Sequence, residues 1–251
     1  MKRTIIIILS IIIALSGFFI SQVDYKVEYT SLSIFFMLLL SAPTYYYFIK
    51  KTNTNKAIKT IIILSLFSMI IESIGIITGT PYGYFTYTER LGAKIGVIPW
   101  TVSFGWVPLV IASWTLSENI IKTKKYEQIK KIILGTLILV AFDLVLDPGA
   151  VALRFWEWQV QGIYYGIPFT NYIGWIISGS IGMTIITKLM QGDRAHSTFL
   201  ITAHLGNIFW TMVAIVNFMI IPSIIGIIIT IYLSQKILRA NNKQNNKTRK
   251  K

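Results

Sequence analysis

The sequence contains no cysteine, only two histidines and only ten acidic residues among its 251 positions. Without cysteine there is no disulfide framework, no thiolate metal ligand and no cysteine nucleophile. Two histidines are too few for a histidine-rich metal site, and the sequence contains neither a Walker loop nor a dinucleotide fingerprint. We therefore expect no metal and no cofactor. Charged residues make up only 14% of the chain, whereas hydrophobic residues make up 54%. This composition excludes a disordered chain and favours a polytopic integral membrane protein over a soluble domain.

Long apolar segments follow one another along the chain. A transmembrane helix needs about 20 mostly apolar residues. Six segments fit: residues 4–20, 30–49, 60–79, 96–116, 132 to about 147, and 171–190. Residues 197–234 are too many for one helix, and a turn at residues 217–222 divides them in two. No small-residue cleavage site follows the first segment, so we interpret it as an uncleaved helix. The sequence therefore predicts an all-α fold with about eight transmembrane helices.

The formal net charge of +14 would suggest nucleic-acid binding on a soluble fold. Here the cations lie between apolar segments, where membrane topology explains them, and we expect no nucleic-acid partner. With the N-terminus in the cytoplasm, eight helices leave 20 of the 24 Lys and Arg residues on the cytoplasmic side, whereas seven leave 13. We therefore predict cytoplasmic termini in the cell membrane, with one transmembrane domain at residues 1–239 and a disordered basic tail at residues 240–251.

Three acidic residues lie inside predicted helices: Glu72, Asp143 and Asp147. Each costs about 2.5 to 3.5 kcal/mol at the centre of a membrane helix, so each needs a reason. Asp143 and Asp147 lie one turn apart on one face, where two like charges do not both ionise easily. One of the pair then keeps its proton near neutral pH, as an acid catalyst must. Alternatively, Asp147 ends its helix before Pro148, and Glu72 and Asp143 make structural contacts between helices.

Aromatic residues are concentrated in segments that should face the outer side. These residues include Trp100, Trp106, Trp158, Tyr165 and Trp175. An aromatic belt at the membrane interface would explain them without any function. However, Pro and Gly residues interrupt the same segments, and irregular backbone at membrane depth survives only when it packs in protein or lines a cavity. We therefore expect residues 79–100 and 147–175 to fold inward over a site.

Three further polar residues have two interpretations each. His204 and Asn207 lie about one turn apart and either face this cavity or hydrogen-bond between helices. Asn171 either contributes to the site or caps its helix.

Two sequence blocks resemble the carotenoid biosynthesis membrane proteins of the bisanhydrobacterioruberin hydratase and carotenoid 1',2'-hydratase type. The first comprises ESIGIITGTPYGY at 72–84, LG at 91–92, IPW at 98–100 and Trp106. The second comprises DLVLDP at 143–148, WEW at 156–158, GIYYGIP at 162–168 and NYIGW at 171–175. Together they span roughly residues 60 to 215.

The resemblance implies hydration of the terminal isopropylidene double bond of an acyclic carotenoid, without a redox cofactor. Such chemistry needs a proton donor, a water molecule and groups that stabilise a tertiary cation. We expect Asp143 or Asp147 as the acid and Glu72 or His204 as the group that orients or deprotonates water. Substrate-binding walls are expected from Trp100, Trp106, Trp158, Tyr165, Asn171 and Trp175. The implied partners are the lipid bilayer, a hydrophobic polyene and other enzymes of the carotenoid pathway.

Three other functions remain open from the sequence. A lycopene cyclase would protonate the same end group and then close a ring instead of adding water. A prenyltransferase would hold Mg²⁺ with several carboxylates, of which the chain has one close pair. A proton-coupled transporter would use Glu72, Asp143 and His204 as a relay between the two membrane faces.

Overall fold

The structure, a computed structural model, describes residues 3–23 and 30–248, with side chains described up to Arg239. Eight α-helices lie within these ranges: α1 Arg3–Ile20, α2 Thr30–Lys51, α3 Thr54–Thr78, α4 Val102–Ile120, α5 Glu127–Ala152, α6 Phe169–Leu189, α7 Ile201–Val216 and α8 Ile220–Thr248. Six helical segments are long and apolar enough to cross a membrane, namely α1, α2, α3, α6, α7 with the short helix before it, and α8. The prediction of an all-α polytopic membrane protein is confirmed.

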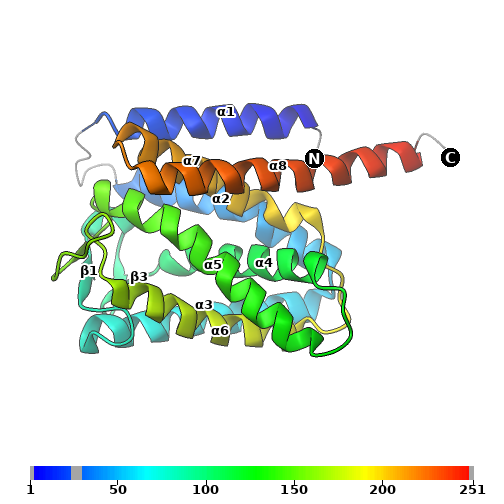
Figure 1. Ribbon diagram of the computed structural model, residues 1–251, viewed down its shortest axis with the longest axis horizontal. Coiled ribbons are helices and arrows are strands. Elements are labelled where there is room, and N and C mark those ends of the chain that lie inside the picture. Colours follow the sequence, from blue (N-terminus) through cyan, green and yellow to red (C-terminus); the bar gives the residue numbers. More distant parts are fainter. Residues whose placement is uncertain (1–2, 24–29, 249–251) are drawn as a thin grey trace.

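The helices form one bundle with most of its loop structure at one end (Figure 1). α1 begins and α8 ends at the opposite end, as an even number of crossings requires. α4 and α5 are the two helices outside the apolar six. With 19 and 26 residues, they are about 28 and 39 Å long, which suffices to cross the hydrocarbon core. Eight membrane crossings and cytoplasmic termini stay predictions.

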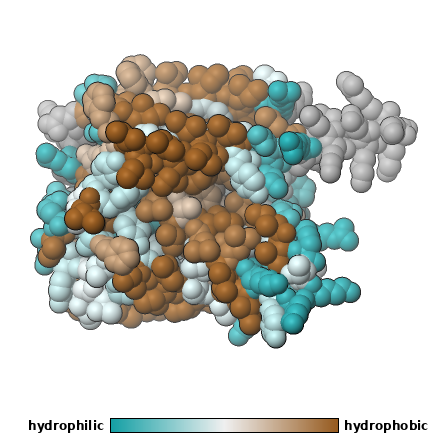
Figure 2. Space-filling view, in the orientation of Figure 1, coloured by the Kyte–Doolittle hydropathy of each residue, from teal (hydrophilic) through white to brown (hydrophobic). Residues whose placement is uncertain are grey.

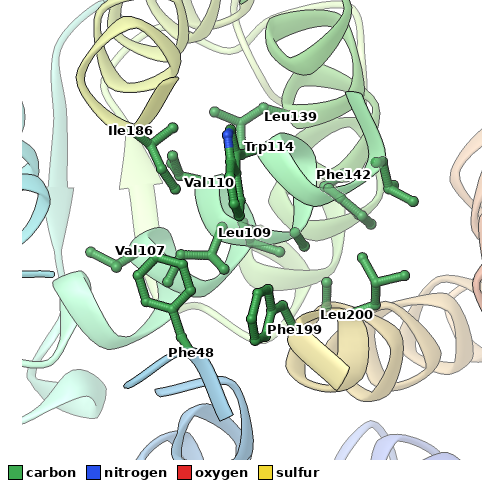
Figure 3. Close-up of a cluster of buried hydrophobic side chains, with 14 of the residues drawn as sticks. Phe48, Val107, Leu109, Val110, Trp114, Leu139, Phe142, Ile186, Phe199 and Leu200 are labelled. Carbon is green, nitrogen blue, oxygen red and sulfur yellow. The ribbon is translucent and has the colours of Figure 1, made fainter. Parts of the chain in front are cut away.

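α4 occupies the middle of the bundle and is surrounded by α2, α3, α5, α6 and α7. All its residues from Trp106 to Ser117 are buried, so this helix needs no lipid-facing apolar surface. Around its second half, Phe48, Trp114 and Phe199 pack with their rings edge to face (Figure 3). Leu139 and Ile186 complete this cluster and are fully buried. The half of the bundle away from the loop end is therefore filled largely by close-packed apolar side chains.

Leucine and isoleucine side chains are exposed along α1, α2, α3, α6 and α8. On the face of the molecule that Figure 2 shows, hydrophobic residues form a broad surface, and hydrophilic residues gather toward the two ends of the bundle. Such a large continuous apolar surface is stable only against lipid.

One interpretation of the sequence placed the end of the fifth helix at Asp147, and this interpretation is wrong. α5 continues through Pro148 to Ala152. A proline inside a helix leaves the carbonyl four residues earlier without its amide partner. Here the hydroxyl of Tyr164 donates a hydrogen bond to the carbonyl of Leu144 at 3.0 Å, which satisfies that group. A tertiary contact thus carries the helix past its proline.

The last helix is also longer than expected. α8 extends to Thr248, beyond position 240, where the sequence predicts the start of a disordered tail. Residues 240–248 contain neither proline nor glycine, so nothing in this stretch stops a helix. The last three residues of the predicted tail lie outside the described residues, and the single-domain assignment stays a prediction.

Residues 79–101 and 153–168 together form a cap over the loop end of the bundle. The cap contains β1 Phe85–Tyr87, the 3₁₀ helix η2 Glu89–Leu91, β2 Lys94–Ile95, β3 Ile98–Pro99 and β4 Trp156–Trp158. β1 pairs with β4 in antiparallel register, so that Phe85 lies opposite Trp158 and Tyr87 opposite Trp156. β2 pairs with β3. The two cap segments, far apart in sequence, are therefore one structural unit.

Tyr82 anchors the cap between two helices. A side chain at Gly75 of α3 would come within 2.6 Å of the Tyr82 ring, and one at Gly174 of α6 would overlap the same ring. The two glycines therefore create the slot that the ring fills, and Tyr82 is 4% exposed. This close approach explains why both helices need glycine at these positions.

Candidate active site

A cavity of about 550 Å³ lies beneath the cap and extends across the bundle. Its walls come from α1 to α7 and from both cap segments. Most lining side chains are aliphatic or aromatic. The two carboxylic acids in the lining are Glu72 from α3 and Asp147 from α5. The sequence expectation that residues 79–100 and 147–175 fold inward over a site therefore matches the structure.

Asp143 and Asp147 share one partner, Asn171. The side-chain amide of Asn171 donates to Asp147 and, at 3.3 Å, to Oδ2 of Asp143. Asp143 is fully buried, while Asp147 is 3% exposed and reaches the cavity. The second carboxyl oxygen of Asp143, Oδ1, has no hydrogen-bond partner in the described part of the chain. The pair is thus held together without any cation beside it, an arrangement that favours one proton over none.

Asn171 does not cap its helix. α6 begins at Phe169 with Pro168 as the residue before it, so Asn171 is already inside the first turn. Its side chain is 2% exposed and is committed to the aspartate pair. The site interpretation of Asn171 therefore fits the structure, and the capping interpretation is wrong.

Glu72 is held by Tyr87 of strand β1. The Tyr87 hydroxyl donates a hydrogen bond to Oε2 of Glu72, and both side chains are 8% exposed. Burial, together with the nearby Glu72 carboxylate, raises the pKa of Tyr87 well above its usual range. The phenol therefore stays protonated and donates to Glu72. The cap thereby fixes the orientation of an acid that belongs to the bundle.

Aromatic rings form much of the remaining wall. Phe85 and Trp158 pack with ring centroids 4.9 Å apart across the β1–β4 pair. Trp106 packs with Phe67 from the side of α3, and the tip of its indole lies where a side chain at Gly182 would be. Of the predicted substrate-binding residues, Trp106, Trp158, Asn171 and Trp175 line the cavity.

Trp100 and Tyr165 do not line this cavity. Trp100 instead packs edge-on against Phe104 at 5.6 Å between ring centroids. Tyr165 has a left-handed backbone, with φ of 52°, and its hydroxyl accepts a hydrogen bond from the amide of Ile221 at the start of α8. Trp100 therefore contacts α4 and Tyr165 contacts the start of α8, and neither ring is part of the cavity wall.

His204 also lies outside the cavity lining. Its Nε2 is 3.3 Å from the hydroxyl of Ser10 on α1, and the side chain is 2% exposed. Asn207, one turn later, does line the cavity, and its amide donates to the carbonyl of Gly226 on α8. The two residues, which the sequence places on one side of a helix, thus contact different neighbours.

Sequence reasoning did not single out two parts of the site. One is Tyr87 as the partner of Glu72, which only the fold of the cap reveals. The other is the wall formed by Phe36, Met37 and Leu40 of α2. Apolar residues in a membrane helix look the same in sequence whether they face lipid or a cavity, so no signal marked this wall.

Comparison with known proteins identifies the family to which this sequence belongs. The sequence profile of a family described as "Carotenoid biosynthesis protein" matches residues 29–233. The chain belongs to this family. The match includes the whole cap, all the acidic residues of the cavity and the helices α2 to α7. The family resemblance predicted from the two sequence blocks is thereby confirmed.

One curated relative of this carotenoid biosynthesis protein has a named activity. The bisanhydrobacterioruberin hydratase of Haloarcula japonica is 38% identical over 128 residues, which cover 50% of the chain and 43% of the relative. The matched segment thus spans less than half of the relative's length. No solved structure matches the chain.

Proposed function

We propose that this carotenoid biosynthesis protein is a hydratase that adds water to the terminal isopropylidene double bond of an acyclic carotenoid. The observation that carries the proposal is the cavity, in which two separate acids, Asp147 and Glu72, face an otherwise apolar and aromatic wall. The partial similarity to a hydratase supports the same chemistry. Hydration changes the oxidation state of neither the substrate as a whole nor the protein, so the reaction needs no redox cofactor.

The first step transfers a proton to the substrate. The pair Asp143 and Asp147 holds one proton, and Asp147 delivers it to the less substituted carbon of the double bond, because Asp147 is the member that reaches the cavity. The bond that breaks is the carboxyl O–H, and the π electrons form the new C–H bond. The product is a tertiary cation. Asn171 keeps the resulting carboxylate in place with its amide hydrogen bonds.

The second step adds water to the cation. Aromatic faces stabilise a desolvated cation by about 2 kcal/mol or more, which is the role of Trp106, Trp158 and Trp175. Glu72 accepts a proton from the attacking water while the Tyr87 hydroxyl donates a hydrogen bond to its Oε2 atom. The new bond joins oxygen to the tertiary carbon. Return of this proton to the aspartate pair closes the cycle, with one water consumed.

The transporter alternative has less support in the geometry. A relay of Glu72, Asp143 and His204 would need the three groups to lie along one polar path. His204 instead contacts Ser10 away from the cavity lining. Beyond the cavity, the apolar cluster around Trp114 fills the bundle interior toward the other end (Figure 3). These contacts favour a reaction chamber that does not continue to the other end of the bundle.

The proposal is tested by expressing the chain in cells that accumulate lycopene or its elongated derivatives and analysing the pigments by mass spectrometry. We expect a mass gain of one water for each processed end. A product of unchanged mass and altered absorption would instead establish ring closure. Unaltered pigments from both kinds of cell, with the protein present in the membrane, would contradict the proposal.

Two glycines offer a way to fill the cavity without disturbing the fold. Gly105 and Gly206 both line the cavity, and a side chain at either position would meet no atom within 4 Å. We expect Gly206→Leu to reduce hydration at least about tenfold, since a single methylene in a pocket changes reactivity about 10- to 200-fold. The thermal unfolding temperature should not fall, because alanine and leucine favour helix over glycine.

Gly206→Ala is the matched control for this prediction. It should reduce turnover less than Gly206→Leu, because it occupies less of the same space. Equal activity of wild type and Gly206→Leu would show that the substrate does not pass this part of the cavity.

A further inference from the structure

One arm of the cavity reaches the outer surface of the bundle between α1 and α2. Its walls there are Ser16, Phe19 and Ile20 of α1 and Leu32 and Phe36 of α2, which together we call the α1–α2 seam. Phe19 is 61% exposed and Leu32 is 58% exposed, so this rim lies on the surface that faces lipid. The lining here is apolar apart from two serines, Ser33 and Ser16, and the hydroxyl of Ser16 donates to its own helix.

Each of the two helices that border the seam is held in place by contacts of its own. α1 packs against α7, where a side chain at Gly17 would come within 2.7 Å of the Phe209 carbonyl. The hydrogen bond between Ser10 and His204 adds a second attachment of α1 to α7. α1 therefore takes its position from α7, and it does not need contacts with α2 to hold it.

α2 is attached to the beginning of α7, to the short 3₁₀ helix before it and to α4. Thr202 donates a hydrogen bond to the Leu40 carbonyl at 2.6 Å, and Thr44 donates to the Phe199 carbonyl at 3.1 Å. On the α4 side, the hydroxyl of Tyr45 donates to the Ser103 carbonyl at 3.2 Å. Because each wall has its own support, the two helices can border an opening without loss of the contacts that hold the bundle together.

The seam is continuous with the acid-bearing part of the cavity. The same cavity is lined by Leu32, Phe36, Met37 and Leu40 of α2 and by Trp106 and Asp147. A ligand that enters between α1 and α2 therefore passes an apolar rim into a cavity that holds a carboxylic acid. A water-soluble substrate gains nothing from such a path, whereas a polyene dissolved in the bilayer needs one.

We infer that the α1–α2 seam is the site through which the end of a lipid-dissolved polyene enters the cavity, while the rest of the molecule stays in the bilayer. This inference rests on the proposed function. A cavity of about 550 Å³ suits a drug-sized ligand, and a linear carotenoid is larger than that. The end group and part of the chain therefore occupy the cavity. The two ends of a symmetric carotenoid then react in separate binding events.

The absence of cysteine from the chain allows a direct test. In the double variant Phe19→Cys and Leu32→Cys, a flexible reagent that joins two thiols through disulfides would close the seam. We expect the initial rate of hydration of lycopene in membranes to fall at least about tenfold after cross-linking and to return after reduction. Mass spectrometry of the protein measures the extent of cross-linking.

The matched control is the double variant Leu66→Cys and Ile70→Cys on α3. These residues are 56% and 59% exposed, lie one turn apart and do not line the cavity. Cross-linking there should leave the rate unchanged. An undiminished rate with the seam fully cross-linked would overturn the inference.

A second measurement separates this inference from the proposed function. The amount of lycopene that stays with the purified protein after detergent washing reports access to the cavity whether or not water is added. If lycopene retention is lost only in the cross-linked seam variant, the inference is supported, whether or not hydration occurs. If retention is normal but no hydration occurs, the result counts against the proposed function. Equal retention with the seam open and cross-linked contradicts the inference.

Discussion

Asp147→Asn is expected to reduce carotenoid hydration at least about 100-fold, because a positioned general acid contributes about 10²- to 10⁴-fold. Asp147 is the member of the aspartate pair that lines the cavity. Asparagine has nearly the same shape but carries no carboxyl proton, so the helix packing around it should persist. The measurement is the ratio of unhydrated to hydrated carotenoid in cells, with the amount of membrane protein determined in parallel.

Asp143→Asn should also cause unhydrated carotenoid to accumulate without loss of the protein from the membrane. Asp143 acts through its partner, since it is fully buried and shares the Asn171 amide with Asp147. Asp193→Asn is the matched control. Asp193 forms an ion pair with Lys56 at 3.1 Å in the loop after α6 and does not line the cavity. If Asp147→Asn hydrated the carotenoid as fully as the wild type, Asp147 would not be the proton donor.

Glu72→Gln and His204→Gln are expected to have opposite outcomes, which distinguishes two residues that the sequence leaves as alternatives. Glu72 lines the cavity and His204 does not. Loss of the group that accepts a proton from water should lower the rate at least about 100-fold in Glu72→Gln. His204→Gln keeps a side chain able to hydrogen-bond Ser10, so its rate should stay within about threefold of wild type.

Tyr87→Phe provides the control for the Glu72 prediction. It removes the hydroxyl that holds Glu72 but keeps the carboxylate, so its effect should be smaller than that of Glu72→Gln. The rates are compared at equal amounts of membrane protein and saturating lycopene. If His204→Gln were the more damaging substitution of the pair, the assignment of water activation to Glu72 would be wrong.

Local sequence signals predicted most of the helical framework. The expected boundaries of the second helix at residues 30–49 and the sixth at residues 171–190 lie within two residues of the observed α2 and α6. The length of an apolar segment and the charges that flank it are properties of that segment alone, so they can be recognised without knowledge of the fold. The end of α5 was missed because Pro148 leaves the Leu144 carbonyl without an amide partner. The hydroxyl of Tyr164, twenty residues after Leu144, supplies the missing hydrogen bond.

The acids were also recognisable in advance, because a carboxylic acid in a membrane helix is costly wherever the helix packs. Their partners were less so. Asn171 had two interpretations, and Tyr87 was one aromatic residue among many until the cap placed its hydroxyl on Glu72. Trp100 and Tyr165 were expected in the cavity from their proximity in sequence to helix breakers, but in the structure they contact Phe104 and the start of α8 instead.

By itself, the sequence determined that this chain is an all-α membrane protein of the carotenoid biosynthesis family with acids inside its helices. The family came from the resemblance of two sequence blocks. Composition and spacing suffice for the fold class and the acids, since the cost of placing charge or unpaired backbone in lipid does not depend on which helices are neighbours. Only the tertiary structure decided which acid reaches the cavity, which aromatic rings line it and which helices border the proposed entrance. Those choices depend on close approaches such as Tyr82 between Gly75 and Gly174, and contacts between distant segments have no local signature in the sequence.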